Sequence, residues 1–167
     1  MSCRRNAIRQ LHRSKTIVFL LAWSIMGCHE APVTQGSHHR LSMAANQVLV
    51  VGNRPNAVAA TVSWLQNRGV TPFEMPGTWP IPTHPEITDT ARRIGAHTIV
   101  WVEQTGDLRA PTVSVRGVDP DSNAVLWSGQ ASATEYRSSP TGARITWLTC
   151  HALHAAWGEP PEGDRCR

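Results

Sequence analysis

The sequence predicts an α/β domain of the α+β kind, with helices packed on one mixed sheet of about five strands. The expected order over residues 47–158 is strand, helix, strand, helix, three strands and helix. Three observations predict it. An apolar run at 47–51 leads into a helical pattern, residues 97–135 contain three strands joined by short turns, and residues 139–158 carry a last helix.

The first strand is expected at 47–51, because an unbroken apolar run is typical of a strand buried on both faces. A helix follows that opens at Asn53 or Pro55, since proline suits a first helical turn, and Gly69 suits the position after the last turn. Its apolar face consists of Val58, Val62 and Leu65. A second short strand at 70–75 completes a crossover that pairs strands in parallel.

Residues 72–85 contain five prolines, which fix the backbone and favour an extended loop. Trp79 and Ile81 lie in this loop and are candidate contacts for a partner protein. The alternative is that Trp79 folds back over the sheet. Thr83 and Glu86 then form the pattern of a capping box at the start of a short helix that ends at Gly95.

Three strands are expected at 97–104, 112–118 and 124–135, and the short turns between them predict an antiparallel meander. The second turn, at 119–123, is rich in Asp, Pro, Ser and Asn. Ser139 and Pro140 are expected to start the last helix, which ends before Gly158.

Three stretches in this half carry a resemblance: Gly95-Ala96-His97-Thr98-Ile99-Val100, Val113 to Asp119, and Ala124-Val125-Leu126-Trp127-Ser128-Gly129. They are similar to a small α/β domain of bacterial envelope lipoproteins. That group includes the curli-secretion lipoprotein, the lipoprotein activators of penicillin-binding proteins and the N-terminal domain of the Tol propeller protein. His97 departs from the aspartate of the group. The resemblance implies adaptor or regulatory roles through protein contacts, without catalytic residues.

Residues 1–27 are predicted to be a signal peptide. Five basic residues precede an apolar run from Thr16 to Ile25, which is too short for the roughly 20 residues that cross a bilayer. The stretch Ile25-Met26-Gly27-Cys28 resembles the lipobox of bacterial lipoproteins, which implies acylation of Cys28 and attachment to the lipid bilayer. The alternative is an ordinary secretory signal. His29, where lipoproteins retained in the inner membrane carry aspartate, favours the outer membrane.

The organisation expected after the signal is a lipidated flexible tether at 28–46, a globular domain at 47–158 and a C-terminal tail at 159–167. Five of the 16 basic residues precede Cys28, so the rest of the chain holds 11 Arg against 12 acidic residues. The sequence after the signal therefore shows no cluster of basic residues, which argues against nucleic-acid binding.

Four cysteines are present, of which Cys3 lies in the predicted signal peptide and Cys28 is the predicted site of acylation. In an oxidising compartment the remaining two, Cys150 and Cys166, are expected to form a disulfide. The alternative is one buried and one free thiol.

The sequence predicts a protein that is not an enzyme and needs no cofactor, because no nucleophile motif is present. The expected function is protein contact in envelope assembly or regulation, with an envelope protein of unknown identity as partner. The alternative is a cell-wall hydrolase or metal-binding enzyme that uses His151 and His154, which share one helix face. A metal tract formed by His29, His38 and His39 is disfavoured, since three histidines on a flexible tether have no cage of carboxylate or cysteine ligands around them.

Overall fold

The structure is a computed structural model that describes residues 32–38, 47–75, 84–107, 110–133, 141–159 and 166. The chain divides into two compact units, Met1–Ala31 and Pro32–Arg167, and all described residues belong to the second. The expected signal peptide, Cys28, Trp79 and Ile81 lie outside the described residues. Among the described helices, none has the length and apolar character needed to cross a membrane.

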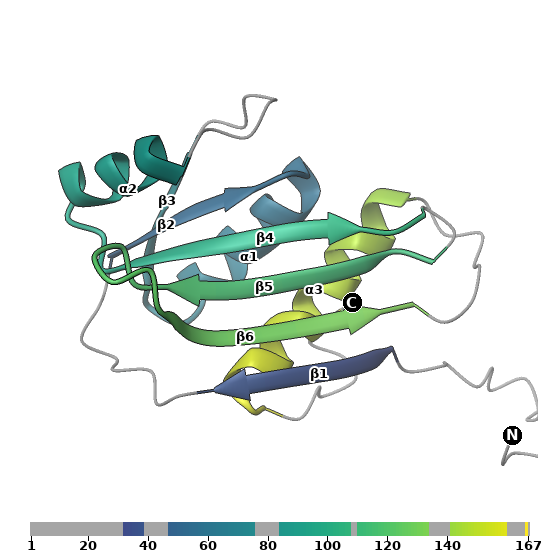
Figure 1. Cartoon of the computed structure of the whole chain (residues 1–167). Helices are drawn as coiled ribbons and strands as arrows, with labels where there is room; N and C mark the ends of the chain where they lie inside the picture. The colour runs from purple at the N-terminus through teal and green to yellow at the C-terminus, as the bar shows by residue number, and fades with distance from the viewer. Residues whose placement is uncertain are drawn as a thin grey trace, which may run out of the picture. The chain divides into compact units, whose positions relative to one another are not determined.

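One open sheet of six strands organises the described part of the chain (Figure 1). Its strands are β1 (Val33–His38), β2 (Gln47–Gly52), β3 (Thr71–Glu74), β4 (Thr98–Thr105), β5 (Thr112–Val118) and β6 (Val125–Ser132). The spatial order is β1-β6-β5-β4-β2-β3. Strand β2 is parallel to β3 and β4, and the remaining pairs are antiparallel. The predicted mixed sheet, with its parallel crossover and its meander, is confirmed.

The helices divide unequally between the two faces of this sheet. Helices α1 (Pro55–Gln66) and α3 (Thr141–Trp157) cover one face together, and α2 (His84–Arg93) lies on the other (Figure 1). The larger core therefore lies under α1 and α3 and includes Val50, Leu65, Val102, Trp127 and Leu148. The smaller core lies under α2, where Ile87 and Ala91 contact Leu49, Val51 and Ile99.

Residues 33–38 correct the expectation of a tether across 28–46, because they form strand β1 at the edge of the sheet. The sequence of residues 33–38 does not alternate between apolar and polar residues, because the position that faces α3 is Gly36 and has no side chain. A Cβ on Gly36 would lie 2.0 Å from the carbonyl oxygen of Ala155, and one on its cross-strand partner Gly129 would lie 2.0 Å from that of Ala152. Close packing of α3 on bare backbone therefore replaces the apolar side chains that mark most strands.

The parallel pair β2 and β4 is extended by Asn53, the residue that follows β2. Its side-chain amide donates to the carbonyl of Gln104 at 2.9 Å, and its side-chain carbonyl accepts from the N–H of Gln104 at 2.8 Å. These two bonds satisfy backbone groups where the parallel ladder ends. The predicted start of α1 at Pro55 is confirmed, and the helix follows directly.

On the face that carries α2, strands β5, β6 and β1 present mainly polar side chains that are exposed or half-buried. Ser37 bonds Ser128 at 2.8 Å, and Thr112 bonds Ser132 at 3.0 Å. Arg116 and the exposed Val33 also lie on this face. Gln35 and Gln130 are exposed cross-strand partners on it. A polar face is the expected arrangement for an antiparallel sheet that is solvated on one side.

Candidate functional site

Helix α3 positions the chemically distinctive side chains of this protein. One side of the helix packs on the sheet through Ile145, Leu148, Ala152 and Ala156. Another side carries Cys150 and His154, which lie beside Cys166, while His151 packs against Trp147. His154 is 2% exposed and His151 is 7% exposed. Two buried histidines on one helix need nearby polar or aromatic partners, and each has a different set.

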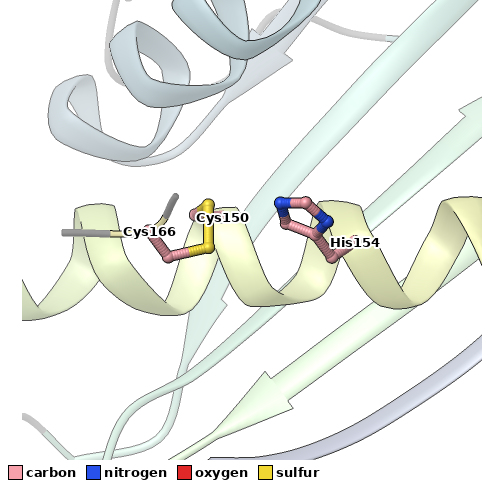
Figure 2. A group of neighbouring side chains, drawn as sticks. All are labelled: Cys150, His154 and Cys166. Carbon is pink, nitrogen blue, oxygen red and sulfur yellow. A yellow bond between two sulfur atoms is a disulfide. The ribbon is translucent and has the colours of Figure 1, made fainter. Parts of the chain in front are cut away.

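A disulfide joins Cys150 of α3 to Cys166 of the tail, with the two Cα atoms 5.5 Å apart (Figure 2). Cys166 is buried and Cys150 is half-buried. The bond closes a loop with a sequence separation of 16 residues. It therefore holds the chain end against the outer side of α3, beside His154.

His154 belongs to a charged cluster at the end of α3. Its Nδ1 lies 3.2 Å from Oε2 of Glu159, which follows the helix. The same carboxylate oxygen accepts from Nη2 of Arg68 at 2.5 Å. The guanidinium of Arg68 stacks 3.4 Å above the ring of Trp64, and Trp64 meets His154 edge-on at 5.9 Å. Arg68 therefore links α1, the tail and the buried imidazole.

His151 has an aromatic rather than a charged environment. The ring of Trp147 lies 4.7 Å from its ring in an edge-on arrangement. Burial, and then the nearby His154, lower the pKa of His151 below the ordinary value of 6.5. The neutral imidazole is therefore the favoured form in the folded protein.

This lowered pKa predicts that stability falls as the pH drops below about 6.5. In that range His151 binds a proton more readily in the unfolded chain than in the folded chain. Stability therefore continues to fall until the pH passes the lower pKa of the folded state. His151→Phe should flatten the dependence of the melting temperature on pH between roughly 5 and 7. An unchanged slope in the variant would show that His151 does not contribute to it.

The structure brings together some of the predicted site residues and separates others. Cys150 and Cys166 are bonded, and His154 lies beside them. In the described part of the chain His151 belongs to no group of three metal-ligating side chains, and the alternative site of His151 with His154 stays a prediction. The predicted contacts Trp79 and Ile81 lie outside the described residues. Arg68 and Trp64 were not predicted, because α1 and Glu159 are distant in the sequence.

The two edges of the sheet differ in how they are protected. Strand β3 is short, contains Pro72 and ends in Glu74, and both features disfavour pairing with another chain. Strand β1 has neither a proline nor a charged residue, and Val33 to Ser37 are exposed. Of the two edge strands in the described part of the chain, β1 is therefore the one with less protection against pairing.

No protein-family model and no curated protein matches this chain. Solved structures do match it. The PelC dodecamer from Paraburkholderia phytofirmans has a TM-score of 0.57 at 13% identity, covering 77% of this chain and 99% of that chain. At 13% identity the likeness to PelC is one of fold.

Two further solved structures share parts of the same arrangement. Lipoprotein GNA1162 from Neisseria meningitidis has a TM-score of 0.41 at 20% identity, covering 57% of this chain and 84% of that chain. TolB from Acinetobacter baumannii has a TM-score of 0.45 at 11% identity, covering 78% of this chain and 33% of that chain. The predicted resemblance to a small α/β domain of bacterial envelope lipoproteins is confirmed as a likeness of fold.

Proposed function

We propose that this chain is a non-enzymatic, lipid-anchored protein of the bacterial cell envelope that acts by protein–protein contact through the β1 edge. The lipobox-like stretch that ends at Cys28 supports the anchor. His29 favours the outer membrane over the inner one. The contact surface that β1 offers at the edge of the sheet supports the expected function in envelope assembly or regulation.

The β1 edge is the observation that carries this proposal. An edge strand presents unpaired N–H and C=O groups, and folded proteins block such edges with charge, proline or short length. Strand β1 spans six residues and has none of these devices. A strand from a partner can therefore extend the sheet beyond β1 by main-chain hydrogen bonds.

A second copy of this chain is the partner that we propose. PelC, which shares this fold along almost its whole length, is a dodecamer. A fold that assembles with itself needs an exposed, compatible surface on every copy, and β1 is such a surface here. Trp79 and Ile81 in the proline-rich loop remain a second proposed contact.

A charge placed on the β1 edge is expected to abolish this assembly. In Gln35→Lys the new ammonium group would have to lie beside the incoming strand, so the self-associated fraction should fall at least tenfold in native mass spectrometry or light scattering. The matched control is Gln130→Lys, since Gln130 is the exposed cross-strand partner of Gln35 one strand further in. Equal assembly in the two variants would exclude the β1 edge.

Removing the proposed lipid attachment site tests the anchor separately. Cys28→Ala should move the protein from the membrane fraction to the soluble fraction, because no thioether to lipid can form. Sucrose-gradient fractionation of cells measures this, with the unaltered chain as control. A variant that stays with the membranes would contradict lipid anchoring at Cys28.

A further inference from the structure

One group of three metal-ligating side chains comes together in the described part of the chain: Cys150, His154 and Cys166. One ligand atom from each lies within 4.8 Å of the other two. Cys150 and His154 are four residues apart on α3, so one helix face carries both. Figure 2 shows the sulfur atoms beside the imidazole, with one ring nitrogen turned towards them.

The orientation of His154 is the second observation that points to a metal. Its Nδ1 faces Glu159 at 3.2 Å, so the nitrogen turned towards the sulfur atoms in Figure 2 is Nε2. The carboxylate therefore lies beside one ring nitrogen, and the other ring nitrogen is turned towards the sulfur atoms. Metal-binding histidines in proteins are held in this way by a carboxylate on the other ring nitrogen. Arg68 in turn fixes Glu159.

The distances suit zinc once the sulfur atoms are no longer bonded to each other. Tetrahedral zinc, with bonds of about 2.3 Å to sulfur and about 2.0 Å to nitrogen, places its ligand atoms roughly 3.5–3.8 Å apart. The imidazole nitrogen lies within 4.8 Å of both sulfur atoms, so a small shift brings it to this range. The two sulfur atoms, 2.06 Å apart in the disulfide, must separate by roughly 1.7 Å. Rotation of the two cysteine side chains covers such a change.

We propose that reduction of the Cys150–Cys166 disulfide converts this cluster into a zinc site, with both thiolates and His154 Nε2 as ligands and water as the fourth. A dithiol reductant transfers two electrons and two protons to the disulfide, which gives two thiols and the oxidised reductant. Zn²⁺ then replaces the two thiol protons, which pass to solvent. The disulfide and the zinc-bound state exclude each other, because both use the same two sulfur atoms. The site is independent of the β1 edge.

Zinc titration of the two redox states tests the proposal directly. The full chain with Cys3→Ser and Cys28→Ser keeps Cys150 and Cys166 as its only cysteines. In anaerobic buffer with a phosphine reductant it should bind one Zn²⁺ per chain in competition with a chromophoric chelator, and Co²⁺ should give a sulfur-to-metal charge-transfer band. The oxidised protein should give neither signal. No zinc binding by the reduced chain, or equal binding by the oxidised chain, would overturn the proposal.

Side-chain variants test the assignment of the ligands. His154→Gln and Glu159→Gln should each weaken zinc binding by about 10–100-fold, the first through a lost ligand and the second through lost orientation. His151→Gln is the control, since this histidine is outside the group, and its affinity should match that of the unaltered chain. Circular dichroism checks folding, and Glu159→Gln stays informative if the buried His154→Gln does not fold. Unchanged affinity in Glu159→Gln, or a loss in His151→Gln alone, would reject this ligand set.

Discussion

Changing Trp127 to alanine is expected to lower the free energy of unfolding by about 3–5 kcal/mol, as truncation of large buried aromatic side chains does. Trp127 is 2% exposed, and its indole lies over its cross-strand partner Gly117. Its ring also meets Trp157 edge-on at 4.7 Å. Truncation therefore leaves a cavity between the sheet and α3. Denaturant unfolding followed by circular dichroism measures the change.

Trp101 provides the matched control for this experiment. It is half-buried on the opposite face of the sheet, beside His84 of α2. Trp101→Ala should cost less, on the order of 1 kcal/mol. A domain of this size is stable by only about 5–15 kcal/mol, so the two variants should differ clearly in their unfolding midpoints. Equal losses would contradict the placement of the larger core under α1 and α3.

Removing the disulfide by changing both Cys150 and Cys166 to alanine is expected to lower the free energy of unfolding by about 3 kcal/mol. The bond closes a loop with a sequence separation of 16 residues, and the unfolded chain gains conformational entropy when that loop opens. The tail would also be released from α3. Changing both residues together avoids a lone buried thiol.

Denaturant unfolding with and without a phosphine reductant measures this effect in two ways. The reductant should destabilise the unaltered protein by an amount similar to the double substitution, and it should leave the double variant unchanged. Non-reducing mass spectrometry should show the Cys150–Cys166 linkage in the unaltered protein. A loss below about 1 kcal/mol would mean that the tail contributes little to the fold.

The elements that the sequence predicts well are those with a local signal. Strands β2 and β4 are unbroken apolar runs, Pro55 marks the start of α1, and the turn at 119–123 carries Asp, Pro and Asn. Each signal acts within a few residues. Strand β1 has no such signal, because Gly36 gives a close approach to α3 instead of an apolar side chain. Its place at the edge depends on β6, which follows it in the chain by about 90 residues.

In the buried site around His154, local features can likewise be predicted from the sequence, and contacts between distant segments cannot. The spacing of Cys150 and His154 on one helix can be read from the sequence, and the pairing of the two cysteines was expected. The role of Arg68 could not be predicted from the sequence, because Arg68 bonds Glu159 across a sequence separation of 91 residues. The sequence also does not indicate whether His154 or His151 lies beside the two cysteines. That choice depends on which side of α3 faces Glu159 and the tail.

Photo-crosslinking in cells tests most directly whether the β1 edge is the contact surface. A photoreactive amino acid at Gln35 should capture a second copy of the chain and give an adduct of twice its mass. The same group at Phe73, exposed on the opposite edge strand β3, should give no such adduct. Capture at position 73 with none at position 35 would contradict the account, and so would the absence of any adduct at position 35.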